Sequence, residues 1–100
     1  MFERSVLLGF MRLHILHHAG EERGVYGVWM IRELKRHGYT IGPGTLYPML
    51  HEMERTGLLS SKKETVGGKV RKVYSSTRKG TAMMEKLREY ISELAREVVV

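Results

Sequence analysis

The side chains with the clearest chemistry are a run of lysines and arginines in the second half of the chain. Residues 58–80 carry seven basic residues against one acidic residue, Glu64, while the segments on either side are close to neutral. The formal net charge of the 100-residue chain is +6, so this stretch holds the whole excess. A local positive excess attracts polyanions, of which nucleic-acid phosphates are the commonest. The alternative is a solvated basic surface without a ligand.

Three histidines form a second chemical group. His14, His17 and His18 follow an i, i+3, i+4 spacing, with Glu21 and Glu22 just beyond them. Imidazoles at this spacing share a helix face and can hold a transition metal with help from a partner chain. Their protonation near neutral pH is another route to regulation. Histidines on a helix edge usually hydrogen-bond to water or to the backbone, and this is the stronger interpretation. We therefore predict no metal and no cofactor, and keep a metal- or pH-responsive sensor that uses these histidines as the alternative function.

The residue types that are missing exclude many sites. The chain has no Cys, Asp, Asn or Gln. Disulfides, thiolate nucleophiles, cysteine zinc sites, Asp-containing triads and EF-hand loops are therefore excluded. No nucleophile–base–orienter pattern is recognisable, so we do not expect an enzyme. The longest apolar run, residues 6–11, is far below the about 18 residues of a membrane span. We expect a cytoplasmic domain without a membrane partner.

Hydrophobic spacing predicts four helices, over residues 3–19, 26–37, 43–56 and 78–98. Pro43 suits the first position of the third helix, and Gly38 and Gly57 suit the ends of the second and third. The third helix has an apolar stripe that should be buried, comprising Leu46, Met49, Leu50 and Met53. The same periodicity predicts the residues that face outward or flank that side: Gly44, Thr45, Tyr47, Pro48, His51 and Arg55.

The basic stretch itself predicts a hairpin. Residues 58–64 and 69–76 resemble two strands around Gly67-Gly68, and Gly-Gly is a hairpin turn signal. Tyr74 belongs in the core, and Thr77 can cap the last helix.

The order of these elements predicts a mainly α fold with a small β-hairpin (α+β), of the winged helix-turn-helix type. Residues 1–80 would form the DNA-binding domain, with the helix over 43–56 in the major groove and the hairpin over 58–76 beside the phosphates as its wing. A winged helix that binds only protein is the alternative, but it needs no such charge. We predict double-stranded DNA as the partner, contacted by Gly44, Thr45, Tyr47, Pro48, His51, Arg55, Lys69, Arg71 and Lys72.

The last helix, over residues 78–98, carries a pattern typical of helix pairing. Its apolar residues step by 3, 4, 3, 4 through Met84, Leu87, Ile91, Leu94 and Val98. Burial against the first helix would give the same pattern. Two recognition helices about 34 Å apart match one DNA turn, so we predict a homodimer that binds an inverted repeat.

Several short motifs together resemble the PadR family of transcriptional regulators. They are Tyr26-Gly27, then Gly44-Thr45-Leu46-Tyr47-Pro48 with Leu50, Glu54, Gly57 and Leu58, and finally Tyr74 to Gly80. The resemblance covers about residues 5–85. It implies a dimeric winged-helix repressor that binds an inverted repeat and is often released by a small effector. It does not identify that effector.

Overall fold

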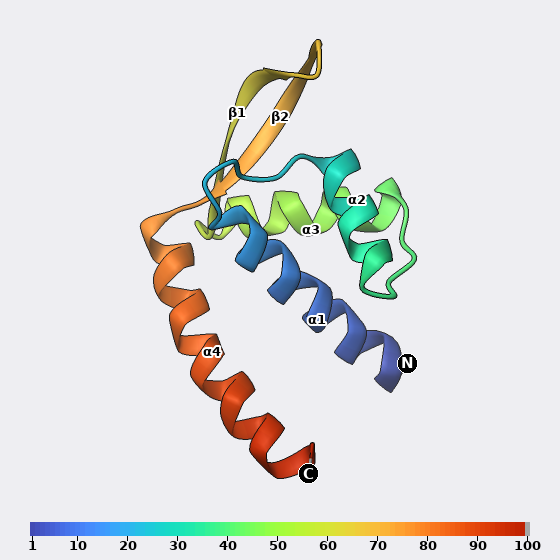
Figure 1. Ribbon diagram of the computed structural model, residues 1–100, viewed down its shortest axis with the longest axis vertical. Helices are drawn as coiled ribbons and strands as arrows, with labels where there is room; N and C mark the ends of the chain where they lie inside the picture. The colour runs from blue at the N-terminus through green and yellow to red at the C-terminus, as the bar shows by residue number, and fades with distance from the viewer. Residues whose placement is uncertain (100) are drawn as a thin grey trace.

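The computed structural model describes residues 1–99. Within that range it contains four helices and one antiparallel hairpin, which confirms the predicted fold class (Figure 1). The helices are α1 (Phe2–Ala19), α2 (Gly27–Arg36), α3 (Pro43–Arg55) and α4 (Arg78–Val98). The strands β1 (Leu59–Val66) and β2 (Lys69–Ser76) lie between α3 and α4.

The signals at the helix ends act as predicted. Gly38 and Gly57 follow α2 and α3 with φ of +94° and +86°, a backbone conformation that favours glycine. Pro43 occupies the first position of α3, where no intrahelical bond is required of its nitrogen. Pro48 lies inside α3, and the helix continues through it to Arg55.

The core lies where α1, α2 and α3 meet. The apolar stripe of α3 is buried as predicted, and Tyr74 is 1% exposed. Three further elements add to this cluster, since Leu59 of β1, Tyr74 of β2 and Met84 of α4 are buried in it. The core cluster comprises Met11, Ile15, Leu16, Ala19, Val25, Met30, Leu34, Leu46, Met49, Leu50, Met53, Leu59, Tyr74 and Met84.

The hairpin is longer than the sequence predicted. We expected its first strand to end at Glu64, but pairing continues to Val66, which lies opposite Lys69. Only Gly67 and Gly68 then remain for the turn, and both have positive φ, at +60° and +81°. A two-residue turn with positive φ at both positions matches the twist of the strands, so pairing extends to the tip.

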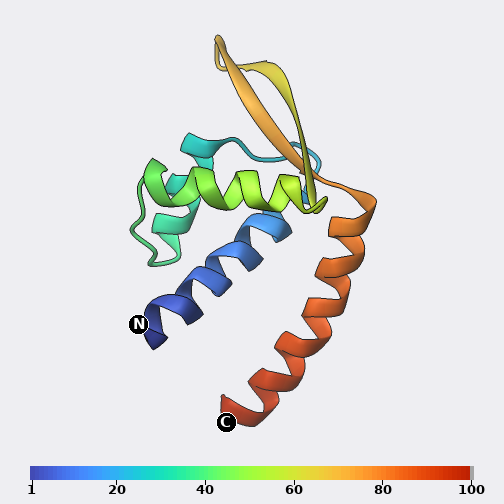
Figure 2. The same cartoon turned by 180° about the vertical axis from the view of Figure 1, so that it is seen from behind.

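The hairpin and α4 extend from the helical body in opposite directions (Figures 1 and 2). Thr77, at their junction, caps α4 as predicted, because its Oγ1 accepts a hydrogen bond from the Gly80 amide at 3.0 Å. A Cβ on Gly80 would overlap the Leu58 carbonyl oxygen, so α4 begins directly against the start of the hairpin. Among residues 1–99, no helix has both the length and the apolar character needed to cross a membrane.

Candidate nucleic-acid interface

The outer face of α3 is open to a ligand. Gly44, Pro48, His51 and Arg55 are exposed, and Thr45 is half-buried beside them. Open space surrounds the position that a Cβ on Gly44 would occupy, so another molecule can approach the backbone there. The first turn of a helix presents backbone N–H groups and the positive end of the helix dipole. This end of α3 is therefore suited to an anion such as phosphate.

Tyr47 connects α3 to α2. Its hydroxyl lies against Gly27 at the start of α2, so closely that a Cβ at Gly27 would overlap it. The ring is half-buried and packs against the core cluster. Tyr47 therefore fixes the separation between the two helices. Position 27 requires glycine because any larger side chain would overlap the Tyr47 ring and hydroxyl.

Arg71 of β2 contacts Tyr26, the residue before Gly27, and so connects the wing to the start of α2. Its guanidinium carbon lies 4.7 Å from the centroid of the Tyr26 ring, a cation–π contact. Arg71 Nε is buried and has no hydrogen-bond partner among residues 1–99. The contacts through Tyr47, Gly27, Tyr26 and Arg71 thus form a continuous path from α3 to the wing.

The three predicted wing cations lie on two faces of the hairpin. Arg71 and Lys72 are adjacent in β2, so their side chains point to opposite faces. Lys72 Nζ is 3.7 Å from Glu54 of α3, whereas Arg71 packs on Tyr26. Lys69 is exposed beside the turn.

Lys63 is a candidate that sequence reasoning did not single out. It lies directly opposite Lys72 in the strand register. Like charges at opposed positions repel, so this pairing favours binding of an anion. Lys63 could have been identified from the sequence once the register of the two strands had been assigned.

Glutamates modulate the charge on α3. Glu54 accepts a hydrogen bond from Ser61 of β1 at 2.7 Å, which connects α3 to the base of the wing. Glu52 pairs with Arg55, with Arg55 Nη2 2.7 Å from Glu52 Oε2. The hydrogen bonds and charge of Arg55 lower the pKa of Glu52, and those of Glu52 raise the pKa of Arg55. A ligand at Arg55 therefore competes with Glu52.

The predicted dimerisation residues divide into two groups along α4. Met84 is buried in the chain's own core and Leu87 is half-buried against it, because this part of α4 packs on α1. Ile91, Leu94 and Val98 are 42%, 51% and 62% exposed. Only the second group leaves apolar surface for a partner.

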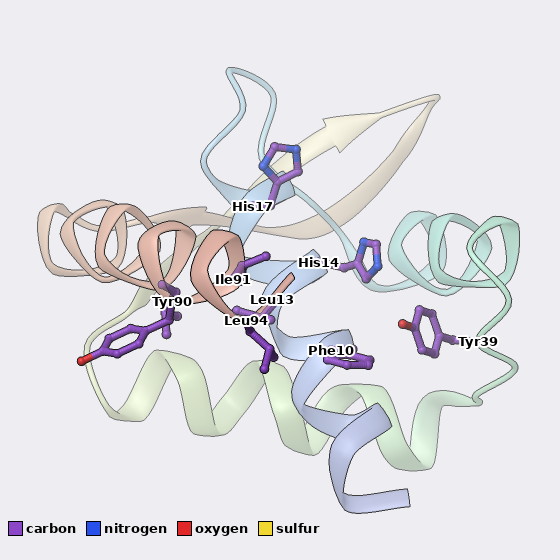
Figure 3. A pocket seen from close by; sticks show the side chains of 9 residues that line it. Phe10, Leu13, His14, His17, Tyr39, Tyr90, Ile91 and Leu94 are labelled. Atoms are coloured by element: carbon purple, nitrogen blue, oxygen red, sulfur yellow. The ribbon is translucent and has the colours of Figure 1, made fainter. Parts of the chain in front are cut away.

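That surface continues onto α1. Phe10 and Tyr90 are 41% and 64% exposed on the two helices. A groove of about 490 Å³ lies between α1 and α4, lined by Phe10, Leu13, His14, His17, Tyr39, Leu87, Tyr90, Ile91 and Leu94. Figure 3 shows Leu13, Ile91 and Leu94 gathered between the two helices, with Tyr39 and Tyr90 on opposite sides of them.

The three histidines of α1 do not act as one group. His14 and His18 lie together with His37, which follows α2, and ligand atoms of all three lie within 4.8 Å of one another. His17 belongs instead to a second group with His18 and Glu21, in which His17 and Glu21 are exposed. The spacing along α1 could not reveal His37, because its approach depends on how α1 packs on α2.

Glu33 lies beside this cluster and is only 7% exposed. Burial raises the pKa of a carboxyl group, but hydrogen bonds from His37 and Arg36 and the charges of Arg36 and His18 outweigh that effect and lower the pKa of Glu33. Burial lowers the pKa of His14, and the neighbouring His37, His18 and His17 lower it further.

Comparison with known proteins identifies the fold's relatives. Residues 15–86 match the model of the transcriptional regulator PadR-like family. The chain is 51% identical over 98 residues to transcriptional regulator Rv3488 of Mycobacterium tuberculosis, a match that covers 98% of this chain and 87% of the relative.

Solved structures agree with that assignment. A PadR-like transcriptional regulator from Bacillus cereus superposes with a TM-score of 0.86 at 27% identity, covering 94% of this chain and 92% of the other. A PadR-like transcription factor from Bacteroides fragilis gives a TM-score of 0.78 at 28% identity, covering 97% and 94%. These proteins are regulators of transcription rather than enzymes, and this chain belongs to the PadR-like family of transcriptional regulators.

Proposed function

We propose that this regulator binds double-stranded DNA in a sequence-specific manner, with α3 in the major groove and the hairpin as a wing along the phosphates. One observation carries the proposal: α3 and the basic hairpin are joined by direct contacts of Glu54 with Ser61 and Lys72, and both lie away from the distal part of α4 (Figures 1 and 2). A groove-binding helix and a charged wing must reach one duplex together.

The side chains available set how the duplex is read. Gly44 and Thr45 suit phosphate contacts at the start of α3, and the wing cations Lys69, Arg71 and Lys72 suit the backbone. The bidentate contact of Asn or Gln to adenine is excluded, because the chain has neither residue. Base reading then depends on Arg, Lys, His51, apolar contacts and DNA shape, so electrostatics supplies a large share of the affinity.

Tyr47, Pro48 and Arg55 complete the proposed contact set in different ways. Tyr47 acts mainly by fixing α3 against Gly27, and its ring centroid lies 6.4 Å from that of the exposed His51. Pro48 offers an apolar surface to thymine methyl groups. Arg55 reaches DNA after releasing Glu52.

We further propose that the functional unit is a homodimer that represses transcription from an inverted repeat and responds to a small effector. The exposed apolar residues of α1 and α4 support a second copy as the occupant of that surface, since exposed apolar patches commonly mark interfaces. Cyclic two-fold dimers are the commonest oligomers, and a two-fold axis suits a palindrome. A dimer covering such a site would block access to it.

The wing is tested by the triple change Lys69→Ala, Arg71→Ala, Lys72→Ala. Binding to a fluorescent non-specific duplex is followed by anisotropy over a range of salt concentrations. We expect the slope of log affinity against log salt to flatten by about 0.9 for each phosphate that the variant no longer neutralises. The matched control removes the same charge from α4, where Lys86, Arg88 and Arg96 are exposed. The control should keep the steeper slope.

Two results would contradict the proposal. An unchanged slope in the wing variant removes the hairpin from the interface. No binding of the wild-type protein to any duplex at low salt removes DNA as the partner.

A further inference from the structure

Three imidazoles and a buried carboxylate converge where α1 packs on the end of α2. His18 Nε2 lies 3.3 Å from Glu33 Oε2, and His37 Nε2 lies 3.0 Å from the same oxygen. His14 stacks on His37 with ring centroids 4.5 Å apart. The DNA-binding and dimerisation roles proposed above do not require these four side chains to lie together.

His18 lies between two carboxylates. Its Nδ1 lies 2.5 Å from Glu21 Oε1, while its Nε2 approaches Glu33. A neutral imidazole carries one N–H and can donate to only one of these carboxylates. When Nδ1 carries that N–H and donates to Glu21, the Nε2 lone pair of a neutral ring faces Glu33 and is available to a cation. The Glu21 contact fixes Nδ1 as the donor, which is the arrangement found for metal-bound histidines.

We propose that His14, His18, His37 and Glu33 form a binding site for a divalent transition-metal ion of the Zn²⁺ type. Imidazole nitrogen with one carboxylate oxygen is a donor set that suits zinc, nickel and copper ions. Arg36 Nη1 lies 2.7 Å from Glu33 Oε1, so it orients the carboxylate and leaves Oε2 facing the histidines.

Small side-chain movements bring the ligands to coordination distance. The three imidazoles offer nitrogens within 4.8 Å of one another, whereas tetrahedral zinc places its nitrogen ligands about 3.4 Å apart. The His37 side chain is 42% exposed at the end of α2 and is held by its contacts with Glu33 and His14, whereas the His18 side chain is 13% exposed. The protein therefore supplies a partly fixed ligand, His18, on α1 and a more adjustable ligand, His37, after α2.

A second arrangement of ligands shares His18 and must be distinguished. His17, His18 and Glu21 also lie within 4.8 Å, but His17 and Glu21 are exposed. The Arg88 guanidinium lies 3.5 Å from His17 Nδ1 and opposes a cation there. The buried carboxylate of Glu33 favours the first arrangement.

Two matched variants separate the arrangements. His37→Gln removes a ligand from the proposed site alone, and His17→Gln removes one from the alternative alone. Zn²⁺ is titrated into each full-length protein in competition with a chromophoric chelator, without DNA. We expect wild type and His17→Gln to bind one ion per chain with equal affinity. His37→Gln should bind at least about tenfold more weakly.

Thermal melting gives a second readout. Zn²⁺ should raise the melting temperature of wild type and His17→Gln, because an ion that binds the folded state stabilises it, and should raise that of His37→Gln much less. Melting without metal shows that the variants fold. Wild-type protein that binds no ion, equal binding by all three proteins, or a loss confined to His17→Gln would each overturn the proposal.

An effect of the ion on DNA rests on the proposed function. The site joins α1 to α2, and Tyr47 couples α2 to α3, so the ion can alter how α3 is presented. Duplex affinity is measured with and without Zn²⁺ in wild type and His37→Gln. A response in wild type alone supports an effector role, and no response in wild type overturns that role. The titration decides the site even if no duplex binds.

Discussion

The wing end and the α1–α4 end of the molecule expose opposite kinds of side chain. The wing end presents lysines and arginines on an exposed hairpin beside α3, whereas the other end presents Phe10, Ile91, Leu94 and similar apolar residues. Charge on a surface suits a polyanion, and exposed apolar area suits another protein surface. The difference supports the separate partners that we propose for the two ends, with DNA at one and a second copy at the other.

The interiors of the two ends also differ. At the wing end, aromatic contacts through Tyr47, Tyr26 and Arg71 fix the exposed groups relative to one another. At the other end, α4 extends away from the body after Leu87, and the residues of its outer half are exposed (Figure 1). A preorganised surface is expected where DNA must be matched, and an incomplete one where a partner supplies the missing contacts.

The largest effect should follow from a charge on the apolar end. Leu94→Glu should convert the dimer to a monomer at micromolar concentration, because it buries a carboxylate in an apolar interface. Loss of the linked second recognition helix should weaken binding to a selected inverted repeat by about 10²–10⁴-fold. Sedimentation velocity and anisotropy measure the two effects.

Ser92→Glu is the matched control for that prediction. Ser92 is exposed on α4, away from the line of Ile91, Leu94 and Val98, and acquires the same charge. It should remain dimeric. A Leu94→Glu protein that sediments as a dimer would show that the apolar end has another role.

An intermediate effect tests the rigidity of the wing end. Gly27→Ala should lower the free energy of unfolding by about 1–3 kcal/mol, because the new Cβ overlaps the Tyr47 ring and hydroxyl. In a Tyr47→Leu background the same change should cost much less. Urea denaturation of the four proteins gives the coupling energy.

Gly44→Ala provides the control for this cycle. A Cβ there meets open space, so stability should be unchanged or slightly raised. Equal costs of Gly27→Ala in both backgrounds would mean that Tyr47 does not set the spacing of α2 and α3.

The sequence predicted regular features well because they depend on local rules. Helix stripes, the glycines that end helices, the Gly67-Gly68 turn and the Thr77 cap each act within a few residues. The opposite faces of Arg71 and Lys72 could also have been predicted, since side chains alternate along a strand.

The features that were missed depend on tertiary packing. His37 meets His14 and His18 only once α2 has packed on α1, and no spacing along either helix encodes that approach. The burial of Glu33 and the contact of Tyr47 with Gly27 arise in the same way. Met84 fitted the heptad pattern, yet it packs in its own subunit, because a helix pattern does not specify which partner covers it.

The smallest effect concerns the junction between the two ends. Thr77 Oγ1 accepts from the Gly80 amide and donates to the Gly57 carbonyl at 2.6 Å, so one hydroxyl caps α4 and holds it to the turn after α3. Thr77→Ala should lower the free energy of unfolding by about 1 kcal/mol, and Thr77→Ser should restore most of it. The control is Thr81→Ala, on an exposed position of α4. If Thr77→Ala weakens dimerisation and duplex binding beyond what its stability loss explains, the ends are coupled through this hydroxyl. If dimerisation and duplex binding are both retained, the wing end and the α1–α4 end act independently, as their separate surfaces lead us to expect.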